Sequence, residues 1–136
     1  MGLGMMSKPC PCGRLDAKKQ VLTYLACCGQ YLDDGLIAPD AQSLMRSRYS
    51  AFVLEKADYL CSTWHASHRP ASLAFEPSVK WLGLQVHNHR VIDATHAEVT
   101  FVARQRDRSG RAIRLHERSR FVYENGGWYY VDGDNL

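Results

Sequence analysis

The sequence predicts an α+β protein in which helices pack on an antiparallel sheet, with a cysteine-rich arm in front of that domain. The first 38 residues hold four of the five cysteines and show no sustained apolar period. Apolar residues recur at steps of three and four after Asp40, and at steps of two from Val79 onward. A chain of 136 residues has room for one domain and a short appendage. We therefore assign residues 1–38 to the arm and residues 39–136 to the domain.

The helical half begins at Asp40, whose side chain is a good N-cap for the segment AQSLMRSRYSAFVLEKA. Leu44, Tyr49 and Phe52 lie on one stripe of this segment, which predicts a long amphipathic helix. A second, shorter helix is expected in DYLCSTWH, capped by Asp58. We expect the helices to end near residue 66.

The second half alternates with the period of a strand and predicts a meander of about four strands. In the first, VKWLGLQVH, we expect Leu82, Leu84 and Val86 on one face and Trp81 on the other. The segments AEVTFVARQR, RAIRLHERSRFVY and WYYVDG follow, and they are separated by turns at Ser109-Gly110 and at Asn125-Gly126-Gly127.

Composition narrows the class of protein. No stretch approaches the length of an apolar membrane span, and no secretory signal is visible, so we expect a cytoplasmic protein without a membrane partner. A net charge of +3 is too balanced to indicate nucleic-acid binding. The chain lacks a glycine-rich phosphate loop, a nucleophile elbow and a His-Glu-x-x-His motif. These absences disfavour nucleotide hydrolysis, serine esterase and zinc protease chemistry.

Four cysteines form two close pairs, one in Cys-Pro-Cys-Gly and one in Cys-Cys-Gly. In a reducing cytoplasm, clustered thiolates match the tetrahedral, sulfur-rich coordination of structural zinc. We expect one structural zinc ion, bound by Cys10, Cys12, Cys27 and Cys28. The alternative is that these residues are free thiols or an oxidisable pair.

The strings CPCG, CCG, LMRSRYSAFV, DYLCSTWH, WLGL, FVARQRD, LHERSRFV and GWYYVDGD resemble the YchJ-like family of uncharacterised bacterial proteins. The resemblance spans roughly residues 9 to 134. It implies a SEC-C type zinc motif joined to a nuclear transport factor 2-like domain, which is a cone of helices against a curved sheet. It also implies the same four zinc ligands. The fourteen residues between Cys12 and Cys27 make this loop longer than in the family motif. Extra loop length adds little closure entropy.

One carboxylate is expected on the apolar face of a strand. Strict alternation places Glu117 on the same face as Leu115 and Phe121, and burial would raise its pKa into a range useful for acid or base catalysis. We expect this pocket to be lined also by Arg48, Trp64, His65 and Tyr129. The alternative is that Glu117 forms a buried ion pair or hydrogen bond, with Arg46 or Arg48 of the long helix as partner.

The opposite face of the same strand is expected to carry a basic row, made of Arg114, His116, Arg118 and Arg120. Such a row is either a solvated face or a surface for an anionic ligand, a nucleic-acid backbone or another subunit. Aromatic residues do not alternate with these arginines as they would in a single-strand binding platform. The solvated face is therefore the preferred interpretation.

Two hypotheses of function follow. In the first, the protein is a non-enzymatic adaptor or binding protein whose zinc arm contacts a protein or ribonucleoprotein partner. In the second, it is a small-molecule enzyme of isomerase, cyclase or hydrolase type that uses Glu117 as acid or base, or a protein that binds an unknown small ligand in the same pocket. The two differ in whether Glu117 lines an open cavity or is closed off by an arginine.

Overall fold

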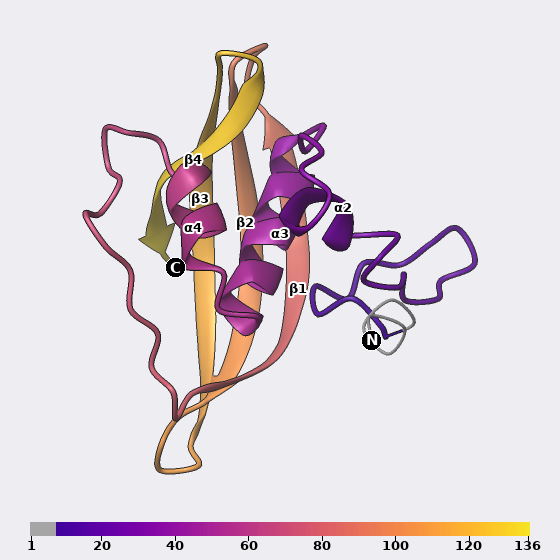
Figure 1. Ribbon diagram of the computed structural model, residues 1–136, viewed down its shortest axis with the longest axis vertical. Coiled ribbons are helices and arrows are strands. Elements are labelled where there is room, and N and C mark those ends of the chain that lie inside the picture. The colour runs from indigo at the N-terminus through magenta and orange to yellow at the C-terminus, as the bar shows by residue number, and fades with distance from the viewer. Residues whose placement is uncertain (1–7) are drawn as a thin grey trace.

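The computed structural model describes residues 8–136, and Figure 1 shows its helices lying across one face of a four-stranded sheet. In chain order the elements are α2 (Gly29–Leu32), α3 (Ala41–Val53), α4 (Ala57–Ser62), β1 (Lys80–Val91), β2 (His96–Arg106), β3 (Ala112–Glu124) and β4 (Gly127–Asn135). The α+β prediction is confirmed. No helix among residues 8–136 is long and apolar enough to cross a membrane.

The sheet is an antiparallel meander with strand order β1-β2-β3-β4, as the alternating pattern predicted. Asn125 and Gly126 adopt φ of 52° and 83°, and Glu124 pairs with Gly127. Positive φ at both central residues is typical of a type I′ hairpin turn, whose twist matches that of the flanking strands. The wider turn at residues 107–111 is held by Asp107, whose side chain accepts hydrogen bonds from the backbone of Ser109 and Arg111.

The long helix α3 begins where its sequence predicts. Asp40 has an extended backbone, and its Oδ1 accepts a hydrogen bond of 2.7 Å from the backbone N of Ser43. The helix ends at Val53, earlier than the predicted segment, because Glu55 turns the chain with a φ of 56°. The predicted cap of the next helix is wrong: Lys56 is the N-cap residue of α4, and Asp58 lies in its first turn.

The core lies between α3, α4 and the inner face of the sheet. Leu44 and Leu60 come from the helices, whereas Val99 and Phe121 come from β2 and β3, and all four are almost completely buried. Burial of such side chains stabilises the domain by about 1.5–3 kcal/mol each. The inward set predicted for β2 is confirmed, since Ala97, Val99, Phe101 and Ala103 are all buried.

Strand β1 departs from the predicted alternation at its start. The pairing with β2 shifts between Trp81 and Gly83, where Gly83 has a φ of 151°. An extra residue at this bulge reverses the face of the side chains before it. Trp81 therefore packs on the inner face against Tyr49, with 5.6 Å between ring centroids, while Leu82 is 49% exposed. The prediction that Leu82 shares a face with Leu84 is wrong for this reason.

Candidate metal centre and cavity

The four arm cysteines converge on one point, although fourteen residues separate the two pairs. Their Sγ atoms all lie within 4.8 Å of one another, and Cys12 and Cys27 are 3.6 Å apart. Zn–S bonds of about 2.3 Å in a tetrahedron place sulfurs about 3.8 Å apart. All four cysteines are free and buried. Geometry and donor chemistry therefore fit a tetrahedral metal site.

A short hairpin brings the first pair to the cluster. Isolated bridges join Pro9 to Thr23 and Leu15 to Val21, and the backbone N of Cys10 donates to the O of Leu22 over 2.8 Å. The tip of this hairpin extends away from α3 in Figure 1. The long loop therefore leaves both ends of the site in place.

The second pair lies on a tight turn before α2. Backbone N atoms of Cys27 and Gly29 both donate to the O of Tyr24, over 3.1 and 2.8 Å. A Cβ at position 29 would lie 2.8 Å from that same oxygen. Glycine therefore lets the backbone close this turn without displacing Tyr24, and the turn directs Cys27 and Cys28 toward the first pair.

The thiols perturb one another's protonation. Hydrogen bonding by Cys12, then by Cys27 and Cys28, lowers the pKa of Cys10 well below its usual range. The contact with Cys10 in turn raises the pKa of Cys28 above its usual range. The pKa of Cys12 is also lowered and that of Cys27 is also raised, so close packing favours ionisation of the first pair at the expense of the second. A bound cation would allow all four thiols to be ionised together.

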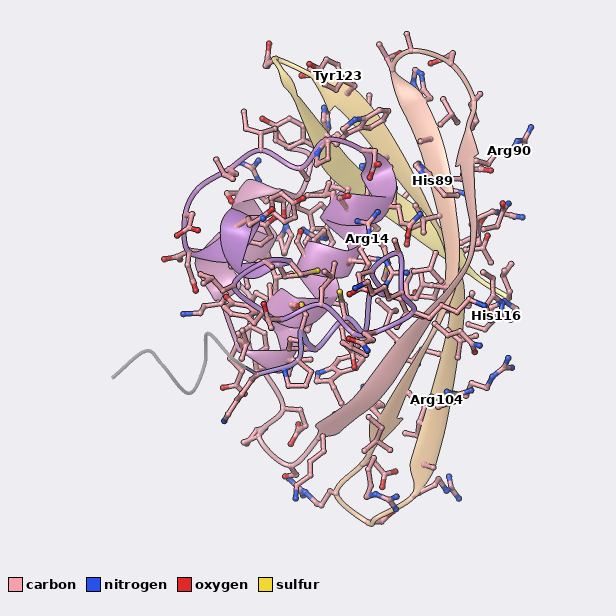
Figure 2. The ribbon with its side chains drawn as sticks, turned by 90° about the vertical axis from the view of Figure 1, so that its right-hand side faces the viewer. Arg14, His89, Arg90, Arg104, His116 and Tyr123 are labelled. Carbon is pink, nitrogen blue, oxygen red and sulfur yellow. The ribbon has the colours of Figure 1, made fainter. Side chains whose placement is uncertain are left out.

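Polar contacts fix the cluster to α3. Arg46 donates from Nη1 to the O of Cys12 over 3.1 Å, and Arg14 donates to Ser43 Oγ over 2.8 Å. Cys10 Sγ lies 3.7 Å from Ser50 Oγ. In Figure 2, Arg14 lies on the side of the sheet that the helices cover. The arm is thus part of the same packed body as the domain.

The neighbouring face of α3 borders a cavity of about 270 Å³. Met45, Arg48, Tyr49 and Phe52 line it from α3, at spacings that share one helix face. Opposite them, β3 contributes Leu115, Glu117, Ser119 and Phe121. One helix therefore carries both the contacts to the cysteine cluster and one wall of the cavity.

Glu117 lies in this cavity with its side chain half-buried, and burial raises the pKa of its carboxyl. Within residues 8–136 it forms no ion pair with Arg46 or Arg48 (N to O within 4.0 Å). Arg46 instead bonds Gln42 and the O of Cys12. Arg48 donates to the O of Leu60 over 2.7 Å and to Thr63 Oγ1 over 2.6 Å. The structure therefore differs from the buried ion pair that was the alternative.

Arg48 is 6% exposed and is held between two aromatic rings. Its guanidinium carbon lies 5.1 Å from the ring centroid of Trp64 and 4.7 Å from that of Tyr130. Burial lowers the pKa of Arg48 to about 10, which leaves it charged at neutral pH. The cavity therefore contains one fixed cation and one carboxyl group that do not contact each other.

Two residues expected in this pocket lie elsewhere. His65 contacts Glu124, with 2.8 Å between Nε2 and Oε2, and does not line the cavity. Tyr129 also lies outside the lining, and its neighbour Tyr130 takes the inner position. Tyr130 pairs with inward-facing Phe121, because the pairing of β3 with β4 shifts between Arg120 and Phe121. The inner face of β4 could not be assigned without that register.

The basic row lies on the outer face of the sheet, where half of it is neutralised. Arg118 pairs with Asp134 at 3.3 Å, and Arg120 pairs with Asp132 and Asp134 at 2.6 and 2.7 Å. Figure 2 shows His116 on the side of the sheet away from the helices. Sequence reasoning missed these pairs because the acids lie on β4. Cross-strand pairing brings them beside the arginines.

Comparison with known proteins agrees with the fold and the cysteine cluster. A family model described as the middle NTF2-like domain of YchJ matches residues 40–133. A UPF0225 protein of a Polaromonas species is 67% identical over 127 residues, which cover 92% of this chain and 91% of the relative. One from Polaromonas naphthalenivorans is 64% identical, over 96% of this chain and all of the relative.

Two solved structures have the same architecture. A SEC-C motif protein from Rhodopseudomonas palustris, solved in solution, is 30% identical with a TM-score of 0.79, covering 94% of this chain and 98% of that one. A crystal structure of another from Psychrobacter arcticus is 31% identical with a TM-score of 0.79, covering 96% of this chain and 84% of that one.

Proposed function

The chain belongs to the UPF0225 family of YchJ-like proteins, and we propose that it is a binding protein whose arm folds around one structural zinc ion. The observation that carries the proposal is the cluster of four buried thiols within 4.8 Å. Sulfur-only tetrahedral donor sets select zinc among common cellular metals. With every ligand supplied by cysteine, no coordination position remains for a substrate, so the ion's role is structural.

The arm is proposed as the contact surface for a protein or ribonucleoprotein partner in the cytoplasm, where reducing conditions keep the thiols available. Its hairpin exposes Leu15 and Val21 on either side of the charged tip residues Lys18 and Lys19, and Leu25 is exposed in the turn that follows. Exposed apolar side chains rimmed by charge are typical of interaction surfaces. In this proposal the zinc ion holds the hairpin rigid, which lowers the entropy cost of binding.

Metal analysis of protein purified under reducing conditions tests the site. We expect one zinc per chain in the wild type, much less in Cys12→Ser, and an unchanged content in the matched control Cys61→Ser. Cys61 lies in α4, outside the cluster. A chelator should lower the melting temperature of the wild type and of Cys61→Ser. A wild-type protein that purifies without metal and melts identically with chelator would remove the zinc proposal.

The partner proposal has its own test. Proteins captured by the wild type in the presence of zinc are compared with those captured by Cys12→Ser and by Cys61→Ser. We expect Cys12→Ser alone to lose specific partners while circular dichroism shows that its domain stays folded. Equal capture by all three proteins would exclude the arm as the contact surface.

A small-molecule enzyme of isomerase, cyclase or hydrolase type is the second candidate, favoured by the position of Glu117. Its carboxyl lies in an aromatic cavity with a raised pKa, as general acids and bases require. In a turnover screen of such reactions, Glu117→Gln should abolish any activity found, also at saturating substrate concentration. Undiminished turnover by this variant would exclude Glu117 as the acid or base.

A further inference from the structure

Several polar groups around the cavity have no protein partner. Within residues 8–136, no hydrogen bond is formed by the carboxylate of Glu117, by Ser119 Oγ, or by Nε and Nη2 of Arg48. Trp64 lines the same cavity, and its buried Nε1 also lacks a partner in that part of the chain. Of these atoms, only Trp64 Nε1 is itself shut off from solvent, and a buried donor is nearly always satisfied in folded proteins. The polar atoms of Glu117, Ser119 and Arg48 are accessible and free to bond a molecule in the cavity.

The arrangement around Arg48 indicates what one end of a ligand would be. The rings of Trp64 and Tyr130 cover the guanidinium, and Nη1 is used by Leu60 and Thr63. Nε and Nη2 remain as a pair of donors along one edge. A guanidinium edge of this kind matches the two oxygens of a carboxylate, and a buried cation without a counter-ion favours an anion over a neutral acceptor.

Glu117 indicates which polar group the ligand would carry at its other end. Because it forms no ion pair with Arg48, its oxygens are left to accept a hydrogen bond from something in the cavity. Both residues border Tyr130: burial raises the pKa of this phenol, and the nearby charge of Glu117 raises it further, while Arg48 opposes the effect. A ligand that spans this phenol would present its donor, a hydroxyl or an amino group, to Glu117.

The remaining walls determine the body of the ligand. Phe52, Trp81, Phe101 and Phe121 contribute aromatic surface to the cavity. Its volume of about 270 Å³ lies just below the usual range of ligand sites, which begins near 300 Å³. Aromatic walls bind flat apolar groups through area burial and edge-to-face packing. The occupant is therefore a small molecule with an apolar, preferably aromatic, body.

We propose that the cavity binds a small aromatic carboxylic acid that also carries a hydroxyl or amino donor, with its carboxylate on Arg48, its donor on Glu117 and its ring among the aromatic walls. This inference goes beyond the zinc arm. The proposed ligand site uses the same cavity as the second candidate function but requires no turnover. Binding without catalysis would therefore support the ligand site and exclude the enzyme function.

The test uses the zinc-loaded 136-residue chain and four probes: phenyllactate, its methyl ester, phenylpropionate and phenylalanine. The ester removes the negative charge, phenylpropionate removes the donor, and phenylalanine replaces the hydroxyl with an ammonium. Binding is followed by NMR at the indole N–H of Trp64, with the indole of Trp128, outside the lining, as internal control. Calorimetry gives the affinities.

We expect phenyllactate or phenylalanine to bind saturably at millimolar concentration or below and to shift the Trp64 signal but not that of Trp128. The ester and phenylpropionate should bind about 10-fold or more weakly, since each loses a hydrogen bond to a charged group. No saturable shift with either donor-bearing acid would overturn the proposal, as would an ester that binds as well as the acid.

Variants assign the roles of the two charged residues. Glu117→Gln should remove most of the preference for phenyllactate over phenylpropionate, whereas Glu98→Gln, on the outer face beside Arg90, should keep it. Arg48→Lys should bring acid and ester closer in affinity. If Arg48→Lys fails to fold, the Glu117→Gln variant still tests the proposal. An unchanged preference of that variant for phenyllactate over phenylpropionate would show that the ligand's donor does not bind Glu117.

Discussion

Replacing Gly29 by alanine tests how closely the turn that carries Cys27 and Cys28 is packed. The new Cβ would lie 2.8 Å from the O of Tyr24 and 3.0 and 3.1 Å from two of its ring carbons. Tyr24 is 3% exposed, so its ring has little room to move. Overpacking of this kind costs about 1–3 kcal/mol. Higher helix propensity of alanine at the start of α2 recovers up to about 1 kcal/mol.

The net expectation is a loss of about 1–2 kcal/mol in the free energy of unfolding, which lowers the melting temperature by several degrees. Because Cys28 is the adjacent residue, the affinity of the proposed zinc site should fall as well. The assays are urea unfolding of the zinc-loaded protein and competition with a chromogenic chelator. Gly127→Ala is the matched control, since its Cβ would meet only a methyl group of Ile37 at 3.9 Å. Equal stability and equal zinc affinity of the two variants would refute the reasoning.

Three further experiments probe the rest of the structure. Glu117→Gln should gain stability relative to wild type as the pH rises above the normal glutamate range, because the raised pKa of Glu117 makes its ionisation in the fold unfavourable. Urea unfolding of both proteins across pH checks this, and a difference in unfolding free energy that does not change with pH would contradict it. Leu60→Ala, at a side chain with 0% exposure, should cost about 2–5 kcal/mol in the same assay, and a loss well below 1 kcal/mol would show that α4 is not part of the core. A double-mutant cycle between Arg120 and Asp134 should give a coupling energy below about 1 kcal/mol that decreases with salt, since both side chains are over one-third exposed; a larger, salt-insensitive value would show a buried pair.

Local patterns in the sequence determined most of the architecture. The N-cap at Asp40, the stripe of α3 and the alternation of β2 depend on neighbours within a few residues, and the structure agrees with each. The turn at Asn125 and Gly126 is equally local, because it follows from the positive φ that these residue types tolerate. The two cysteine pairs could be recognised as one ligand set from their chemistry alone.

Only the tertiary structure decided which side chains share a site. A bulge beside Gly83 moved Trp81 into the cavity, and the register shift between β3 and β4 placed Tyr130 there in place of Tyr129. Side-chain faces in a strand alternate with a period of two, so a single extra residue reverses them, and nothing within a few residues of the sequence reveals where it falls. The partners of Arg120 depend on pairing with another strand in the same way. Residue types and their order thus determined the layers, the strands and the cysteine pairs, while long-range pairing determined what surrounds Glu117.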